Sequence, residues 1–271
     1  PSNPIPSIIS LQKLMAHIIS VVNQKGGVGK TTTTLNLAAY LADAGKFVLL
    51  VDLDPQANAT SGLGLNHKEL SAGVYEGIVG SHALDKLIHK TDHEGLMVLP
   101  ATQALAGAAV ELVNADEREH FLRKMLLPVR NDYDYIFIDN PPSLGMLTLN
   151  GLVAADSVLI PVQAEYYALE GLSQLLNTVN LVRDNIKPSL ELMGAVITMY
   201  DARTKLSKEV LEELYRFFPD KIFRSVIPRS VRLAEAPSFG KTILGYDPSS
   251  KGAKAYGRLA REFMLREEGA L

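Results

Sequence analysis

Apolar residues in this chain gather in short runs, and most runs are apolar at consecutive positions rather than at alternate ones. A strand that is buried on both faces has this pattern, which is typical of a parallel sheet covered by helices on both sides. The runs predict strands at residues 18–22, 48–53, 96–99, 135–139, 157–162, 192–199 and 222–227. Between them, apolar residues with a helical period predict helices at residues 32–44, 116–130, 169–185, 205–217 and 251–266.

The alternation of strands and helices predicts an α/β fold with a single doubly wound, mostly parallel sheet that has helices on both faces. No internal repeat and no break in composition marks a second domain, so we expect residues 16–271 to form one domain. Residues 1–15 are expected to form a loose tail, because three of the first six residues are proline and no hydrophobic period is visible. Residues 64–95 are the least regular part of the predicted domain.

The composition is that of an ordinary globular protein, with 47% hydrophobic and 21% charged residues. The chain contains no cysteine, which excludes disulfides, cysteine zinc sites and iron–sulfur clusters. No apolar run approaches the roughly 18 residues of a membrane-spanning helix, and the start of the chain lacks the pattern of a secretory signal. We therefore expect a cytoplasmic protein.

Positive charge is concentrated in one part of the chain. The formal net charge is −3, but residues 201–262 contain thirteen lysines and arginines against eight aspartates and glutamates, an excess of five. A protein that binds nucleic acid at all times is usually basic overall. On charge alone, the simplest interpretation of this basic stretch is a solvated face.

A glycine-rich segment from Gln24 to Thr32 joins the first predicted strand to the first predicted helix. In that setting, backbone N–H groups of the loop and the positive end of the helix hold phosphate oxygens. Lys30 is expected to reach the β- and γ-phosphates of a nucleotide, and the Thr31 hydroxyl is expected to bind Mg²⁺. The predicted nucleotide-binding residues of the segment are Lys25, Gly26, Gly27, Val28, Gly29, Lys30, Thr31 and Thr32.

The segment departs from the standard phosphate-loop pattern, in which four residues separate a first glycine from Gly-Lys-Ser/Thr. Gln24 occupies the position of that glycine, and Lys25 follows it. This is the deviant Walker A form, which has a second lysine at the start of the loop. Because one loop cannot easily place two lysines on the same phosphate oxygens, Lys25 is a candidate to reach the nucleotide of another subunit.

Two further strands end in aspartate, at the edge of the sheet where open α/β folds bind ligands. Asp54 is the better candidate to orient an attacking water, whereas Asp52 can satisfy loop backbone; alternatively, Asp54 only begins a turn with Pro55. Asp139 follows four apolar residues and is predicted to be the Walker B aspartate, which holds Mg²⁺ through a water molecule. A helix cap is the alternative role for Asp139.

Taken together, these motifs resemble the ParA/Soj family of deviant Walker A ATPases, which partition plasmids and chromosomes. The resemblance runs from about residue 18 to residue 266 and rests on KGGVGKTT (25–32), VDLDPQ (51–56), DNPPS (139–143), PVQAEYY (161–167), MYDART (199–204) and PRSVRLAEAPS (228–238). The last two motifs belong to the chromosomal branch of the family. The chain has Asn140 where many members have a small residue, and Ser230 where members often have asparagine.

The resemblance implies that ATP binding drives a sandwich homodimer, with Lys25 crossing to the phosphates of the partner. It also implies that the ATP dimer binds double-stranded DNA without sequence preference, so that the protein associates with the nucleoid. A ParB-type centromere-binding partner then stimulates an otherwise weak, Mg²⁺-dependent ATP hydrolysis, and the dimer is released as ADP forms.

Roles for single residues also follow from the resemblance. It implies catalytic roles for Lys25, Lys30, Asp54 and Asp139, and Mg²⁺ contacts from Thr31, Asp54 and Asp139. It places Pro228 and Ser230 against the adenine of the nucleotide. The residues that it assigns to DNA are Arg203, Arg229, Arg232 and Lys241, although Arg203 can equally cap a turn or pair with Asp201.

The main alternative is a MinD-type membrane-associated ATPase, which shares the phosphate loop but needs a basic, amphipathic C-terminal helix. Here the C-terminal segment contains Glu262, Glu267 and Glu268, which oppose binding to an anionic membrane surface. We therefore expect no membrane partner. A small-molecule ligase or kinase is a third alternative, and the sequence offers it no obvious pocket for a second substrate.

Overall fold

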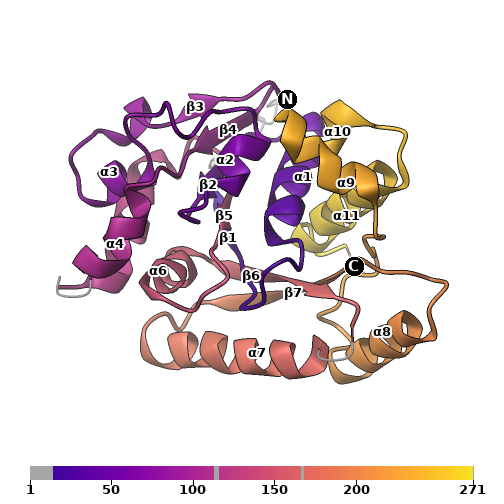
Figure 1. Cartoon of the computed structure of the whole chain (residues 1–271). Helices are drawn as coiled ribbons and strands as arrows, with labels where there is room; N and C mark the ends of the chain where they lie inside the picture. Colours follow the sequence, from indigo (N-terminus) through magenta and orange to yellow (C-terminus); the bar gives the residue numbers. More distant parts are fainter. Residues whose placement is uncertain (1–14, 113–115, 166–167, 271) are drawn as a thin grey trace, which may run out of the picture.

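The computed structural model describes residues 15–112, 116–165 and 168–270, which form one twisted sheet between two layers of helices (Figure 1). The strands are β1 His17–Val21, β2 Val48–Asp52, β3 His89–Lys90, β4 Leu96–Leu99, β5 Tyr135–Asp139, β6 Ser157–Gln163 and β7 Glu191–Thr198. They lie in the order β3-β4-β2-β5-β1-β6-β7, and only the β3–β4 pair is antiparallel. This arrangement confirms the predicted doubly wound α/β class.

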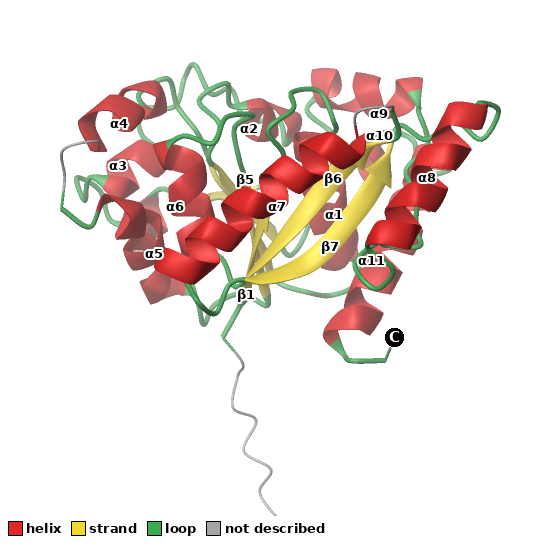
Figure 2. Ribbon diagram, turned by 90° about the horizontal axis from the view of Figure 1, so that it is seen from below, coloured by secondary structure: helices red, strands yellow, loops and turns green. Residues whose placement is uncertain are grey.

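Two hydrophobic cores lie on the two faces of the sheet. One face is covered by α3 Val74–Ile78, α4 Leu105–Glu111, α5 Phe121–Leu126, α6 Met146–Ala154, α7 Ala168–Asn185 and α8 Lys205–Phe217. The other face is covered by α1 Lys30–Asp43, α2 Asn58–Gly62, α9 Val231–Glu235, α10 Ile243–Tyr246 and α11 Lys251–Glu267. Figure 2 shows α7 lying across β6 and β7.

The two cores explain why the strands are apolar at consecutive positions. In β2, Leu49 and Val51 pack in the core beneath α3–α8, whereas Val48 and Leu50 pack in the core beneath α1 and α11. All five residues of β2 are buried, so none of them faces water. Among the described residues, no helix is both long enough and apolar enough to cross a lipid bilayer.

The predicted strand at residues 222–227 is wrong, because this segment makes only one isolated bridge, Ala195 to Ile222, and a second, Tyr200 to Pro228, lies just after it. The backbone N–H groups of Arg224 and Ser225 do not join a ladder. They donate instead to the carboxylate of Glu262 on α11, at 2.7 and 2.8 Å. The segment therefore bulges away from β7 between its contacts with that strand.

The predicted helix at residues 116–130 is also wrong as a continuous element. It is divided into a 3₁₀ turn at Arg118–His120, the α-helix α5, and a second 3₁₀ turn at Leu127–Val129. Pro128 lies in the last turn, where it cannot donate the backbone hydrogen bond of a continuing α-helix. The sequence also gave no signal for the two-residue strand β3.

Candidate functional site

The glycine-rich segment forms the loop between β1 and α1, at the carboxyl edge of the sheet. Gly27 and Gly29 have φ angles of 76° and 87°, in the left-handed region that glycine adopts readily. Gly29 is the N-cap of α1, so the loop leads directly into the positive end of that helix. A cleft of about 560 Å³ opens above the loop and is lined by Lys30, Thr31, Asp54, Pro142 and their neighbours. This volume suits a small-molecule ligand.

Side chains from the first turn of α1 meet the end of β5. Thr31 Oγ1 donates a hydrogen bond to Asp139 Oδ2 at 2.7 Å, and Thr34 Oγ1 donates to Asp139 Oδ1 at 2.9 Å. Lys30 is buried beside them, and its Nζ donates to the backbone carbonyl of Lys25 at 3.2 Å. The structure therefore brings together Lys30, Thr31 and Asp139, as the sequence predicted.

The charges in this cluster are poorly solvated. Burial lowers the pKa of Lys30, and the carboxylates of Asp139 and Asp54 oppose that shift. Burial also raises the pKa of Asp139 to about 6, against the hydrogen bonds from Thr31 and Thr34. The adjacent hydroxyl and carboxylate oxygens of Thr31 and Asp139 are the hard donors that Mg²⁺ prefers, and Lys30 suits a phosphate. These residues therefore fit a Mg²⁺–nucleotide complex.

The two aspartates after β2 have different surroundings. Asp52 is fully buried, and its carboxylate accepts hydrogen bonds from Thr60 N at 2.8 Å, Thr60 Oγ1 at 2.7 Å and Asp54 N at 3.2 Å. Burial and the nearby Asp139 raise the pKa of Asp52 to about 7. Asp54 lines the cleft, and its Oδ1 accepts a hydrogen bond from Gln56 N at 3.0 Å. Asp52 thus supports the loop backbone, as expected, and Asp54 is the one of the two carboxylates that lines the cleft.

A second, mostly apolar pocket of about 170 Å³ lies beside the phosphate loop. It is lined by the predicted residues Pro228 and Ser230 and by residues that sequence reasoning missed, among them Thr198, Met199 and Tyr256. Thr198 Oγ1 donates to the carbonyl of Val28 at 2.8 Å, so β7 supports the loop directly. The pocket has the size and apolar lining of a site for a flat ring.

Two of the missed residues differ in the signal that they carry. Met199 has a φ angle of 51°, which is uncommon for a residue with a side chain. It follows the end of β7 in the sequence, as Asp54 follows the end of β2. Tyr256 lies on α11, and its hydroxyl is 3.1 Å from Thr33 Oγ1, across 223 residues of sequence. No local pattern predicts that contact.

Lys25 has a different environment from Lys30. Its ammonium group pairs with Glu165, which follows β6, and its backbone N–H donates to Asn23 Oδ1 at 3.0 Å. The side chain of Lys25 is 54% exposed. The structure therefore directs the second lysine of the loop towards Glu165 rather than towards the cluster of Lys30 and Asp139.

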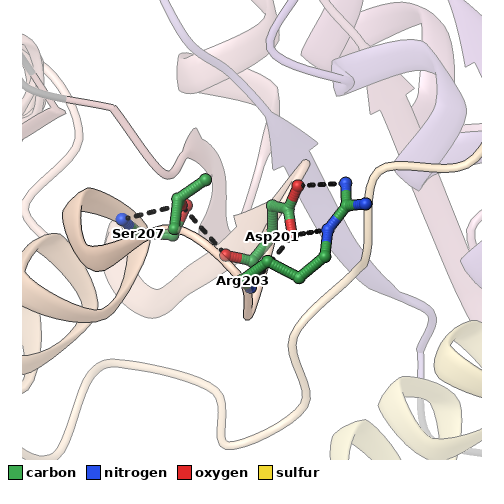
Figure 3. Close-up of polar contacts among 4 residues, drawn as sticks. Asp201, Arg203 and Ser207 are labelled. Carbon is green, nitrogen blue, oxygen red and sulfur yellow. Dashed lines mark hydrogen bonds and ion pairs between the residues drawn. The ribbon is translucent and has the colours of Figure 1, made fainter.

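The predicted DNA-contacting arginines are paired with carboxylates. In Figure 3, Arg203 holds the carboxylate of Asp201 through Nε at 2.9 Å and Nη2 at 2.7 Å. These hydrogen bonds lower the pKa of Asp201 below its usual range. Arg232 contacts Glu235 at 3.0 Å and Asp247 at 3.5 Å. The side chains of Arg203 and Arg232 are nevertheless 88% and 56% exposed.

The other two predicted DNA contacts lie near the same region. Arg229 lines the apolar pocket, and its backbone N–H donates to the carbonyl of Tyr200 at 3.2 Å, two residues after Thr198. This hydrogen bond ties the segment of Arg229 to the loop of Asp201 and Arg203. Lys241 is exposed, and its backbone N–H donates to the carbonyl of Ala236 at 3.2 Å.

Comparisons with known proteins agree with this geometry. A family model described as an AAA domain matches residues 16–192. The chain is 56% identical to the sporulation initiation inhibitor protein Soj of Bacillus subtilis over 248 residues, which are 92% of this chain and 98% of that protein. It is 52% identical to the chromosome partitioning protein ParA of Myxococcus xanthus over 253 residues, which are 93% of this chain and 89% of that protein.

A similar crystal structure contains a nucleotide. The structure is that of a cobyrinic acid a,c-diamide synthase from Mycobacterium smegmatis with bound ADP and magnesium. The TM-score is 0.83 at 37% sequence identity, and the match covers 95% of this chain and 97% of that one. Its ligands are the two that the cleft of this chain fits.

Proposed function

The chain belongs to the ParA/Soj family of chromosome-partitioning ATPases, and from this membership we propose that ATP controls its assembly on DNA. In the proposed cycle, ATP binding joins two copies, the dimer holds DNA without reading its sequence, and hydrolysis separates the copies. The observation that carries the proposal is the cluster of Lys30, Thr31 and Asp139, because it provides the cation, hydroxyl and carboxylate that hold a nucleotide phosphate and its metal ion.

In this proposal each residue of the cleft has a distinct task. Thr31 and Asp139 would hold Mg²⁺, which when bound would neutralise charge at the β- and γ-phosphates. Lys30 neutralises the same phosphates from the loop, and the loop N–H groups bind their oxygens. Asp54 orients the attacking water with Oδ2, since its Oδ1 accepts a hydrogen bond from Gln56. The adenine occupies the apolar pocket beside Pro228 and Ser230.

Lys25 makes the proposed dimer depend on ATP. In the structure its ammonium group pairs with Glu165 and is half exposed, so it can leave that carboxylate for a stronger anionic partner. The γ-phosphate of a second copy is such a partner, because it carries more negative charge than one carboxylate. In the proposed dimer, the Lys25 side chains of the two copies hold the two nucleotides. We propose that hydrolysis stays weak in this state until a ParB-type protein binds and stimulates it.

DNA binding by the proposed dimer uses the exposed arginines near the apolar pocket. Contacts with phosphates need positive charge on one surface and no base-reading geometry. Two copies double that charge, which reconciles DNA binding with a formal net charge of −3 for one chain. Arg203, Arg229, Arg232 and Lys241 are the residues that we assign to this surface, and the nucleoid is the location that we propose for the dimer.

The decisive experiment measures binding to unrelated DNA duplexes and to anionic lipid vesicles, with ATP and with ADP. We expect DNA binding with ATP, little with ADP, and no vesicle binding in either state. Lys30→Ala is the control, because it should abolish nucleotide binding and with it the difference between ATP and ADP. Vesicle binding with ATP would favour the MinD-type alternative, and failure to bind either surface would favour a small-molecule enzyme.

A further inference from the structure

Asn140 follows Asp139 at the end of β5 and is fully buried. Its Nδ2 lies within hydrogen-bond distance of Ser20 Oγ at 2.9 Å, the carbonyl of Val21 at 3.0 Å and the carbonyl of Ile138 at 3.1 Å. Its Oδ1 has no hydrogen-bond partner among the described residues. An unpaired carbonyl in the interior is destabilising, so packing alone does not favour asparagine at this position.

Asn140 also restricts what the next helix can contain. Gly151 on α6 faces its amide, and a Cβ atom at Gly151 would lie far inside van der Waals contact with Asn140 Oδ1. Asparagine at 140 is therefore compatible only with glycine at 151, unless one of the two segments moves. The pair has a structural cost on both sides, an unpaired oxygen at one position and a helical glycine at the other.

The benefit of this arrangement lies in the backbone next to Asp139. The sheet hydrogen bond from Asn140 N to the carbonyl of Val21 is 3.4 Å long, which is beyond the usual range. Asn140 Nδ2 donates to the same carbonyl at 3.0 Å and so supplements the long backbone hydrogen bond. On the other side, Leu53 N donates to the carbonyl of Asp139 at 2.9 Å. The backbone of Asp139 is thus held from β1 through Asn140 and from β2 through Leu53.

From these contacts we infer that Asn140 is a positioning residue for Asp139. By fixing β5 to β1 where the strand hydrogen bonds end, it sets the carboxylate of Asp139 at hydrogen-bond distance from Thr31. Val21 lies only a few residues before the phosphate loop, so the same contact fixes the distance between the loop and the aspartate. The inference rests on the proposed function, because it assigns the Mg²⁺ site to Thr31 and Asp139.

The test compares four variants with the wild-type chain. Asn140→Ala removes the amide, and Gly151→Ala pushes the amide out of place. The double variant Asn140→Ala/Gly151→Ala fills the space without the amide. Asn150→Ala is the matched control, because Asn150 is also fully buried and hydrogen-bonded, to Leu122 N at 3.1 Å and to the carbonyl of Arg118 at 2.8 Å. None of these hydrogen bonds of Asn150 involves Asp139.

Two quantities are measured for each variant: the thermal midpoint, and the Mg²⁺ concentration that half-saturates the effect of Mg²⁺ on the affinity for a fluorescent ADP analogue. Loss of groups that orient metal ligands typically weakens metal affinity 10–100-fold. We expect about a tenfold increase in the Mg²⁺ requirement for Asn140→Ala, Gly151→Ala and the double variant. The thermal midpoint of the double variant should be higher than that of Gly151→Ala, since the steric overlap is gone.

Two results would overturn the inference. One is a normal Mg²⁺ requirement in the double variant, which would mean that Asn140 serves packing only. The other is an equal increase in Asn150→Ala, which would mean that any loss of stability weakens the metal site. If the wild-type chain binds the analogue without any effect of Mg²⁺, the proposed metal site itself fails, and this outcome is distinct from the other two.

Discussion

Asp201 is expected to limit how strongly Arg203 binds a DNA phosphate, and replacing it tests the proposed DNA surface. Its carboxylate accepts hydrogen bonds from Nε and Nη2 of Arg203, along the edge that would also suit a phosphate. Asp201→Asn removes the charge but keeps Oδ1, which accepts a hydrogen bond from the backbone N–H of Arg203 at 3.0 Å. The loop should therefore keep its shape, while the guanidinium group loses its ion pair and the hydrogen bond from Nη2 to Oδ2.

The expected change in salt dependence follows from the number of phosphates that the released arginines neutralise. The logarithm of DNA affinity falls with the logarithm of salt concentration with a slope of about −0.9 for each phosphate that is neutralised. One released arginine in each of two copies should steepen this slope by about 1.8. For each protein, the affinity at about 50 mM salt is divided by the affinity at about 200 mM salt. This ratio should be roughly tenfold larger for Asp201→Asn than for wild type.

Fluorescence anisotropy with a labelled duplex, in ATP and at several salt concentrations, measures the slope directly. Asp220→Asn is the control, because this substitution makes the same change in net charge. Asp220 is exposed and lies beside residues of β7 and α11. Arg203→Gln in the Asp201→Asn background should remove this steepening, because no arginine is then left to release. If Asp201→Asn leaves the slope unchanged or weakens binding, Arg203 either does not contact phosphate or needs Asp201 to orient it.

Three further variants address dimerisation, hydrolysis and the support of the segment 222–227 by Glu262. Lys25→Ala should still bind ATP by calorimetry but remain monomeric with ATP in light scattering; an ATP dimer would contradict the crossing role of Lys25. Asp54→Ala should bind ATP and DNA but release no phosphate, and normal turnover would assign the water to another group. Glu262→Ala leaves two backbone N–H groups unpaired, so we expect a loss of about 3 kcal/mol in unfolding free energy and weaker nucleotide binding. Denaturant titration measures that loss, with exposed Glu268→Ala as the control; a loss under about 1 kcal/mol would contradict the role of Glu262.

The phosphate site could be predicted because its residues are close in sequence or stand at recognisable positions. Lys30 and Thr31 belong to one continuous motif, and Asp139 ends an apolar run that had to be a buried strand. Once the strands were known to be parallel, their carboxyl ends had to meet at one edge. The pairing of Arg203 with Asp201 was one of the predicted alternatives, because the two residues are only two positions apart in the sequence.

The errors arose where distant residues decide the local structure. Residues 222–227 have the composition of a strand, but Glu262 takes two of their N–H groups from 38 and 37 positions away. The apolar pocket needed Tyr256 from α11, which no pattern near the phosphate loop reveals. The inferred role of Asn140 depends on its contacts with Gly151 on α6 and Val21 on β1. It can therefore be recognised only when α6, β1 and the end of β5 are placed together.

The bulged segment after α8 also determines how copies of this chain can associate. The backbone at and next to this segment already forms hydrogen bonds with β7. The carbonyl of Lys221 accepts from Ala195 N at 2.6 Å, and Ile227 N donates to the carbonyl of Ile197 at 2.8 Å. At the opposite side of the sheet, β3 is only two residues long. Exposed strand edges are the usual template for uncontrolled pairing between chains, and short or covered edges suppress it. In the described part of the chain, both sides of the sheet therefore suppress edge-to-edge pairing, so such pairing would compete little with the ATP-dependent dimer that we propose.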